Sequence, residues 1–77
     1  MKDFLEYIVK KLADNPDKVA VEETTTENQN IYTLKIDKSD MGKIIGKEGK
    51  IISSIRNLAK VAALKEGKQI RVELLEA

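Results

Sequence analysis

The residues best suited to chemistry form a short turn with a glycine at each end, Gly46-Lys47-Glu48-Gly49. A glycine turn that leads into a helix exposes backbone N–H groups and the positive end of the helix dipole, and together these can hold a phosphate. Because glycine has no side chain, a ligand backbone can approach the protein backbone closely. The candidate anion-binding residues are the turn and the lysines beside it: Gly46, Lys47, Glu48, Gly49, Lys43 and Lys50.

A purely structural explanation of the same glycines competes with this one. Gly46 can end one helix and Gly49 can form a tight corner before the next, and an isolated G-x-x-G pattern more often has this meaning. The phosphate motifs of nucleotide-binding proteins fit poorly. Three residues separate Gly42 from Gly46 where a P-loop has four, and Lys47 is followed by Glu48 instead of Ser or Thr.

The composition excludes most catalytic chemistry. The chain has no Cys and no His, so zinc sites, Ser-His hydrolases and thiol nucleophiles are excluded, and only carboxylate or lysine chemistry remains. We therefore expect a protein that is not an enzyme and that uses no metal, cofactor or small-molecule substrate.

Length and charge indicate one small domain, residues 1–77, with a basic segment. The chain has 77 residues, of which 42% are hydrophobic and 35% charged, as in a globular domain. No apolar run is long enough to cross a bilayer or to form a signal peptide, so no membrane contact and a cytoplasmic location are expected. Residues 1–34 carry four Lys against seven acidic residues, whereas residues 35–71 carry ten basic against four acidic residues. Residues 35–71 therefore carry a net charge of +6, and they include the glycine turn. This excess of positive charge around the turn suits an anionic partner.

The elements that position the turn are predicted from periodicity. Apolar residues at helical spacing predict a helix from Asp3 to Ala13, which ends before Pro16. Alternation predicts strands over 19–26 and 32–36, joined as an antiparallel hairpin by the polar turn Glu27 to Asn30.

Two more helices and a strand complete the chain. Asp37 to Asp40 offers N-cap side chains for a helix from Met41 to Ile45, which Gly46 closes in a left-handed conformation. A longer helix from Lys50 to Glu66 has an apolar stripe of Ile51, Ile55, Leu58 and Ala62, and a third strand follows over 70–74. The expected fold is α+β, in the order α-β-β-α-α-β, with three helices packed on a three-stranded mixed sheet.

The turn in this context resembles the signature of the KH RNA-binding domain, whose G-x-x-G loop clamps a nucleotide backbone. Isoleucine pairs flank the loop, and the order of elements is similar to that of a type II KH domain. The run from Asp40 to Gly49, with Ile55-Arg56 and Ala62-Ala63, resembles end to end the KhpA family of small bacterial single-KH proteins. Glu48 departs from the uncharged or basic residue expected in the loop of this family.

The resemblance implies a groove that binds single-stranded RNA, bounded on one side by the glycine turn and its two helices and on the other by a strand and the loop around Glu27 to Asn30. In this interpretation Gly46 to Gly49 hold sugar-phosphate, Arg56 reaches a phosphate or a base edge, and the groove floor is formed by Ile44, Ile45 and Ile52. The isoleucines could instead be ordinary core residues, as is expected of Ile51 and Ile55. The three aromatic residues are assigned to packing, Phe4 and Tyr7 in the first helix and Tyr32 in the sheet, so stacking on bases is expected to contribute little.

The same resemblance implies partners. Members of the family form homodimers, pair with a larger KH-containing protein, KhpB (Jag), and act as RNA chaperones in regulation of the cell envelope, including cell shape and cell wall biogenesis. The last helix also carries more apolar residues than one face needs, which a second protomer could cover unless the sheet and first helix already do: Ile52, Ala59, Val61, Ala63 and Leu64.

Two alternative functions stay open at this point. The helix from Lys50 to Glu66 could be the recognition helix of a helix-turn-helix DNA-binding protein, although its first residues, Ile51 and Ile52, are apolar where base-reading residues are polar. Alternatively, Glu48 could mark a protein-interaction module that does not bind RNA.

Overall fold

The chain folds in the predicted order of helix, strand, strand, helix, helix, strand, and the computed structural model describes all residues 1–77. Short 3-10 turns precede β1, α2 and α3 at Pro16–Lys18, Lys38–Asp40 and Lys47–Gly49. None of the helices is long and apolar enough to span a membrane. The main elements are α1 (Lys2–Leu12), β1 (Ala20–Thr25), β2 (Asn30–Ile36), α2 (Met41–Ile45), α3 (Lys50–Lys65) and β3 (Ile70–Glu76).

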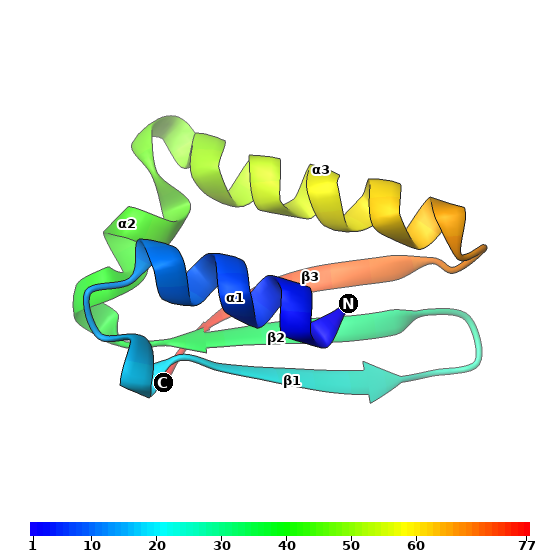
Figure 1. The fold of residues 1–77 in the computed structure, drawn as a ribbon, viewed down its shortest axis with the longest axis horizontal. Coiled ribbons are helices and arrows are strands. Elements are labelled where there is room, and N and C mark those ends of the chain that lie inside the picture. Colours follow the sequence, from blue (N-terminus) through cyan, green and yellow to red (C-terminus); the bar gives the residue numbers. More distant parts are fainter.

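The three strands form one mixed sheet in the order β1-β2-β3. β1 pairs antiparallel with β2, with Val21 opposite Leu34, and β3 pairs parallel with β2, with Leu74 opposite Leu34. All three helices cover the same face of the sheet, and α3 runs along β3 (Figure 1). The predicted architecture is confirmed, and β3 is an edge strand whose free side is turned toward α3.

The core lies between the sheet and the helices, where alternate residues of β2 meet the inner faces of α1 and α3. The fully or almost fully buried side chains include Leu5, Val9, Tyr32, Leu34, Ile36, Ile44, Ile52, Ile55 and Ala59. The predicted inner stripe of α3 is wrong in part, because Leu58 is 52% exposed and the buried positions are Ile52, Ile55, Ala59 and Ala63. Both stripes have helical spacing, so the packing against the sheet decides which of them faces inward.

The aromatic residues of α1 are not packed in the core. Phe4 and Tyr7 are 43% and 63% exposed, so their predicted role in packing is wrong, whereas Tyr32 is buried as predicted. The ammonium group of Lys11 lies 5.4 Å from the centre of the Tyr7 ring.

A buried carboxylate joins the end of α1 to the start of α2. Asp40 is 1% exposed, and its carboxylate accepts hydrogen bonds from the backbone N–H of Asp14 at 3.1 Å and of Asn15 at 2.9 Å, and from the Asn15 side-chain amide at 3.2 Å. Burial raises the pKa of Asp40, but these hydrogen bonds outweigh it and hold the pKa below the ordinary value of 3.8. The predicted capping is therefore corrected: the Asp37 side chain caps the 3-10 turn by accepting from the Ser39 N–H, and Asp40 makes no side-chain cap bond to α2.

Candidate nucleic-acid interface

The glycine turn links α2 to α3 at one end of the molecule and has an unusual backbone (Figure 1). Three of its four residues have positive φ: Gly46 (φ 76°, ψ 177°), Glu48 (φ 57°, ψ 25°) and Gly49 (φ 72°, ψ 15°). A single internal hydrogen bond closes the turn, from the Gly49 N–H to the Gly46 carbonyl at 3.2 Å. A further backbone hydrogen bond, from the Lys50 N–H to the Lys47 carbonyl, joins the turn to the first residue of α3. The turn therefore leads directly into the positive end of the α3 dipole, which favours an anion.

The two glycines are required for different reasons. A β-carbon added to Gly46 would lie 2.5 Å from Cγ1 of Ile51, so packing inside the protein excludes a side chain there. A β-carbon added to Gly49 would meet nothing within 4 Å, so the space above Gly49 is open to a ligand. Gly46 does close α2, with its N–H donating to the Gly42 carbonyl at 2.9 Å, but its ψ of 177° differs from the left-handed conformation predicted.

The three lysines near the turn have different surroundings. Lys47 and Lys50 are exposed on the turn and at the start of α3, where the Lys50 ammonium lies 3.8 Å from the Glu48 carboxylate. Lys43 instead forms an ion pair with Asp14 at the end of α1. Lys47 is therefore the unpaired charge of the turn, Lys50 is partly neutralised, and Lys43 belongs to the junction between α1 and α2.

The isoleucines around the turn mostly belong to the core. Ile44 has no exposed surface and Ile52 is 6% exposed, so neither side chain can lie against a base. Their interpretation as groove floor is corrected to core packing beneath the turn. Ile45 and Ile51 are partly buried against the same core, and Ile45 is the one member of the predicted floor that is not classed as buried.

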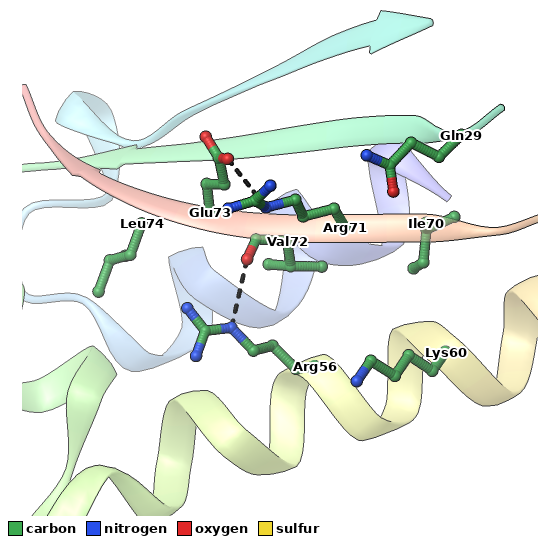
Figure 2. Close-up of a pocket in the computed structure, with 8 residues that line it drawn as sticks. All are labelled: Gln29, Arg56, Lys60, Ile70, Arg71, Val72, Glu73 and Leu74. Carbon is green, nitrogen blue, oxygen red and sulfur yellow. Dashed lines mark hydrogen bonds and ion pairs between the residues drawn. The ribbon is translucent and has the colours of Figure 1, made fainter. Parts of the chain in front are cut away.

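A groove runs between α3 and the edge strand β3 and has a volume of about 620 Å³ (Figure 2). Ile70, Val72 and Leu74 point from β3 toward α3, while Arg56 and Lys60 reach from α3 toward β3. The lining residues are Gln29, Arg56, Lys60, Ile70, Arg71, Val72, Glu73 and Leu74. Apolar strand side chains face basic helix side chains, which suits a ligand with planar bases and a phosphate backbone.

Arg56 connects the two walls of this groove. Its Nε donates to the backbone carbonyl of Val72 at 3.2 Å (Figure 2). Lys60 lies one helical turn further along the same side of α3. Arg71 points away from α3 and pairs with Glu73, Nε to Oε1 at 3.1 Å. The structure thus places Arg56 in the groove, beyond the start of α3.

Several groove residues were not predicted from the sequence. The spacing of Lys60 four residues after Arg56 is a signal that both lie on one side of the helix. The alternation of Ile70, Val72 and Leu74 shows that they share a face of their strand. Only the strand order reveals that this strand is an edge beside α3, so the groove wall could not be assigned without the structure.

Comparisons with known proteins agree with this architecture. Residues 2–74 match the family described as KhpA/KhpB, KH domain. The RNA-binding protein KhpA of Clostridium acetobutylicum is 49% identical over 75 residues, which cover 97% of this chain and 100% of that protein. The RNA-binding protein KhpA of Chlamydia trachomatis is 45% identical over 76 residues, covering 99% and 97%.

Two solved structures share the fold at low sequence identity. Aquifex aeolicus Era bound to GDP.AlF4- superposes with a TM-score of 0.68 at 18% identity, and Era in complex with MgGDPNP and nucleotides 1506-1542 of 16S ribosomal RNA superposes with a TM-score of 0.65 at 20% identity. Each match covers 97% of this chain and 29% of the Era chain. The fold is a type II KH domain, and the chain belongs to the KhpA/KhpB KH-domain family.

Proposed function

We propose that this protein binds single-stranded RNA through the Gly46–Gly49 turn and the groove between α3 and β3, and that it acts without catalysis in the cytoplasm. The observation that carries the proposal is that the turn and the groove border the same helix, α3: the turn lies at its N-terminus and the groove along its side. Relatives of this chain are named RNA-binding proteins.

In this mechanism the turn holds the backbone of the RNA. The positive end of the α3 dipole and the ammonium group of Lys47 face the phosphates, and the open space above Gly49 lets the sugar-phosphate chain approach. Glu48 opposes this binding, because its carboxylate repels phosphates and draws Lys50 toward itself. Gly46 shapes the turn, and Lys43 and the core isoleucines Ile44 and Ile52 hold α2 in place.

The bases lie in the groove beside the inward side chains of β3, and Ile45 next to the turn is proposed to contact the RNA there. Arg56 and Lys60 provide the positive charge of this groove. No aromatic side chain lines it, so the stacking contribution of about 1 to 3 kcal/mol per base that aromatic platforms provide is missing. A single site of this kind binds weakly.

Weak binding by one site favours pairing of protomers. The corrected apolar surface of α3 consists of Leu58, Val61 and Leu64, which are 52%, 55% and 76% exposed, whereas Ile52, Ala59 and Ala63 are buried within the protomer. At 100° per residue the three exposed side chains centre on the side of α3 opposite the core. We propose that this surface, the outer face of α3, pairs with a second copy of the chain or with a KhpB-type protein.

The proposed cellular role is that of an RNA chaperone in post-transcriptional regulation linked to the cell envelope. Support for it comes from membership of the KhpA/KhpB family. Crosslinking in cells followed by sequencing of the bound RNA identifies the target transcripts and tests this role, because a random set of transcripts would contradict it.

The binding proposal is tested by making the turn repulsive while keeping its glycines. The double variant Lys47→Asp, Glu48→Asp changes the net charge by −2, and Lys2→Asp makes the same change at the first residue of α1, away from the turn. Fluorescence anisotropy with a single-stranded RNA should show weaker binding by the double variant and nearly unchanged binding by Lys2→Asp. Equal binding by both variants would show that the turn is not the site.

The same assay with duplex DNA separates the helix-turn-helix alternative. Ile52 in the first turn of α3 is buried against the core, so its side chain cannot contact base edges in a major groove. Binding to single-stranded RNA should exceed binding to duplex DNA. A clear preference for duplex DNA would contradict the proposal, and binding to neither would favour a protein-interaction module.

A further inference from the structure

The free edge of β3 presents hydrogen-bonding backbone groups to the groove. The opposite side of β3 pairs with β2. There the Gln69 carbonyl accepts from the Asn30 N–H, and the Ala77 N–H donates to the Ile36 carbonyl, so the backbone N–H and C=O groups of odd-numbered residues point toward β2. Because alternate residues of an edge strand face opposite sides, the N–H and C=O groups of the even-numbered residues face the groove. Those residues are Ile70, Val72 and Leu74, the same three whose side chains line it.

One of these groups already has a partner within the protein. The Val72 carbonyl, at the middle of this edge, accepts the hydrogen bond from Arg56 Nε. An arginine side chain has five N–H donors and no acceptor. With Nε directed at the strand, the remaining guanidinium donors stay available beside Val72, and one of the two acceptor positions of the Val72 carbonyl is taken.

We propose that Arg56 sets the purine preference of the groove, by selecting guanine over adenine at the level of Val72. This inference rests on the proposed RNA binding by the groove. Among the purines, guanine presents O6 and N7 as adjacent acceptors, and arginine binds this pair with two hydrogen bonds. Adenine presents an N6 amino donor beside N7, and that donor meets the donors of the guanidinium group instead of an acceptor.

Arg56 and Lys60 are not equivalent in this scheme. Both carry positive charge into the groove, but only Arg56 has a hydrogen bond that fixes its side chain against the strand. A fixed planar fork discriminates between bases, whereas a lysine acts as a mobile point charge that favours any phosphate. Base preference should therefore depend on Arg56, and Lys60 should contribute to affinity for all sequences alike.

The test uses uracil octamers that carry one guanine or one adenine in the middle, measured by fluorescence anisotropy on the full chain. The guanine octamer should bind about 5- to 150-fold more tightly, as a bidentate base contact implies. Replacing guanine by inosine keeps O6 and N7 and should preserve the preference, whereas 7-deazaguanine lacks N7 and should lose most of it. A wild-type protein that prefers adenine, or that binds all octamers equally, overturns the proposal.

Two variants connect the preference to the side chain. Arg56→Lys keeps the charge but not the fork, so binding should persist while guanine and adenine octamers become equivalent within about two-fold. Lys60→Met should weaken binding to both octamers and retain the preference. If Arg56→Lys retains the preference, or strengthens binding to all octamers equally, Arg56 does not select the base.

The free protein provides a check that does not depend on RNA. The Arg56 Nε–H should exchange slowly with solvent in nitrogen-15 NMR spectra because of its bond to Val72, and a rapidly exchanging group overturns the proposal. If the proposed RNA binding itself is wrong, the wild-type chain binds none of the octamers, and this result is distinguishable from the outcomes that contradict the role of Arg56. Binding without a base preference contradicts only the role of Arg56.

Discussion

Gly46 and Ile51 are in such close contact that a β-carbon on Gly46 would lie 2.5 Å from Cγ1, 2.8 Å from Cβ and 2.8 Å from Cδ1 of Ile51. The Ile51 β-carbon is fixed to the backbone of α3, so rotation of its side chain cannot relieve the overlap. The first glycine of the turn therefore sets how closely the start of α3 approaches the end of α2.

The first prediction compares alanine at the two glycines. Gly46→Ala combines backbone strain at φ 76° and ψ 177° with overpacking and should cost roughly 2 to 6 kcal/mol of unfolding free energy. Gly49→Ala meets no atoms and should cost only about 1 to 2 kcal/mol for its left-handed conformation. Urea unfolding measures both. Equal losses of unfolding free energy in the two variants would show that the contact with Ile51 does not add to the cost of Gly46→Ala.

The second prediction concerns Glu48, the one residue other than glycine with positive φ. Glu48→Gln removes the charge and keeps the backbone strain, so RNA binding at low salt should tighten about 2- to 5-fold without a change in stability. Glu48→Gly should tighten binding similarly and leave stability equal or up to about 1 kcal/mol higher. At 1 M salt, screening should remove the difference in binding. A difference that persists there would exclude an electrostatic cause.

The third prediction concerns acid stability. Because the pKa of Asp40 is lower in the folded protein than in the unfolded chain, its contribution to stability is present above about pH 3.8 and is lost as the pH falls through the folded pKa. Asp40→Asn places an amide nitrogen near three donors and should lower the melting temperature at pH 7. The deficit should shrink below about pH 3.8.

Asp37, three residues before Asp40, provides a control for this prediction. The hydrogen bond from the Ser39 hydroxyl lowers the pKa of Asp37, so Asp37 contributes with the same sign. Asp37→Asn removes that contribution and leaves the Asp40 carboxylate in place. If the deficit of Asp40→Asn were constant with pH, its hydrogen bonds would not depend on the charge of the carboxylate.

The fourth prediction concerns the outer face of α3. Val61→Asp puts a charge at the centre of this face and should convert a dimer to monomer in sedimentation at micromolar concentration, with little loss of protomer stability because Val61 is 55% exposed. Tyr7→Asp, at the more exposed aromatic residue of α1, is the matched control and should stay dimeric. A wild-type chain that sediments only as monomer would contradict the proposed pairing.

Much of the fold could be predicted because its signals are local. Alternation in β1, β2 and β3, the boundary before Pro16 and the glycine after α3 fix the order of elements. The inner side of α3 could not be predicted, because apolar residues surround that helix and only its packing on the sheet distinguishes Ile52 from Leu58. Phe4 and Tyr7 were misassigned for a related reason, since aromatic composition does not determine burial.

The candidate site divides in the same way. The glycine turn and its lysines follow each other in the chain, so their grouping could be predicted from spacing. The wall formed by β3 depends on strand order, and the ion pair between Lys43 and Asp14 depends on the approach of α1 to α2. Both are tertiary relationships, which cannot be predicted from residue spacing. The sequence therefore places Lys43 with the turn and gives no reason to place Ile70 in a site.

The groove and the outer face occupy different sides of α3, so the proposed pairing through Leu58, Val61 and Leu64 would leave both grooves open. Such a pair holds two weak sites at a fixed separation, and a transcript bound at one of them meets the other at an effective concentration in the millimolar range. Transcripts with two accessible single-stranded segments at the right distance are then retained about 10²- to 10⁴-fold better than those with one. The spacing of unpaired segments becomes a property that the protein selects.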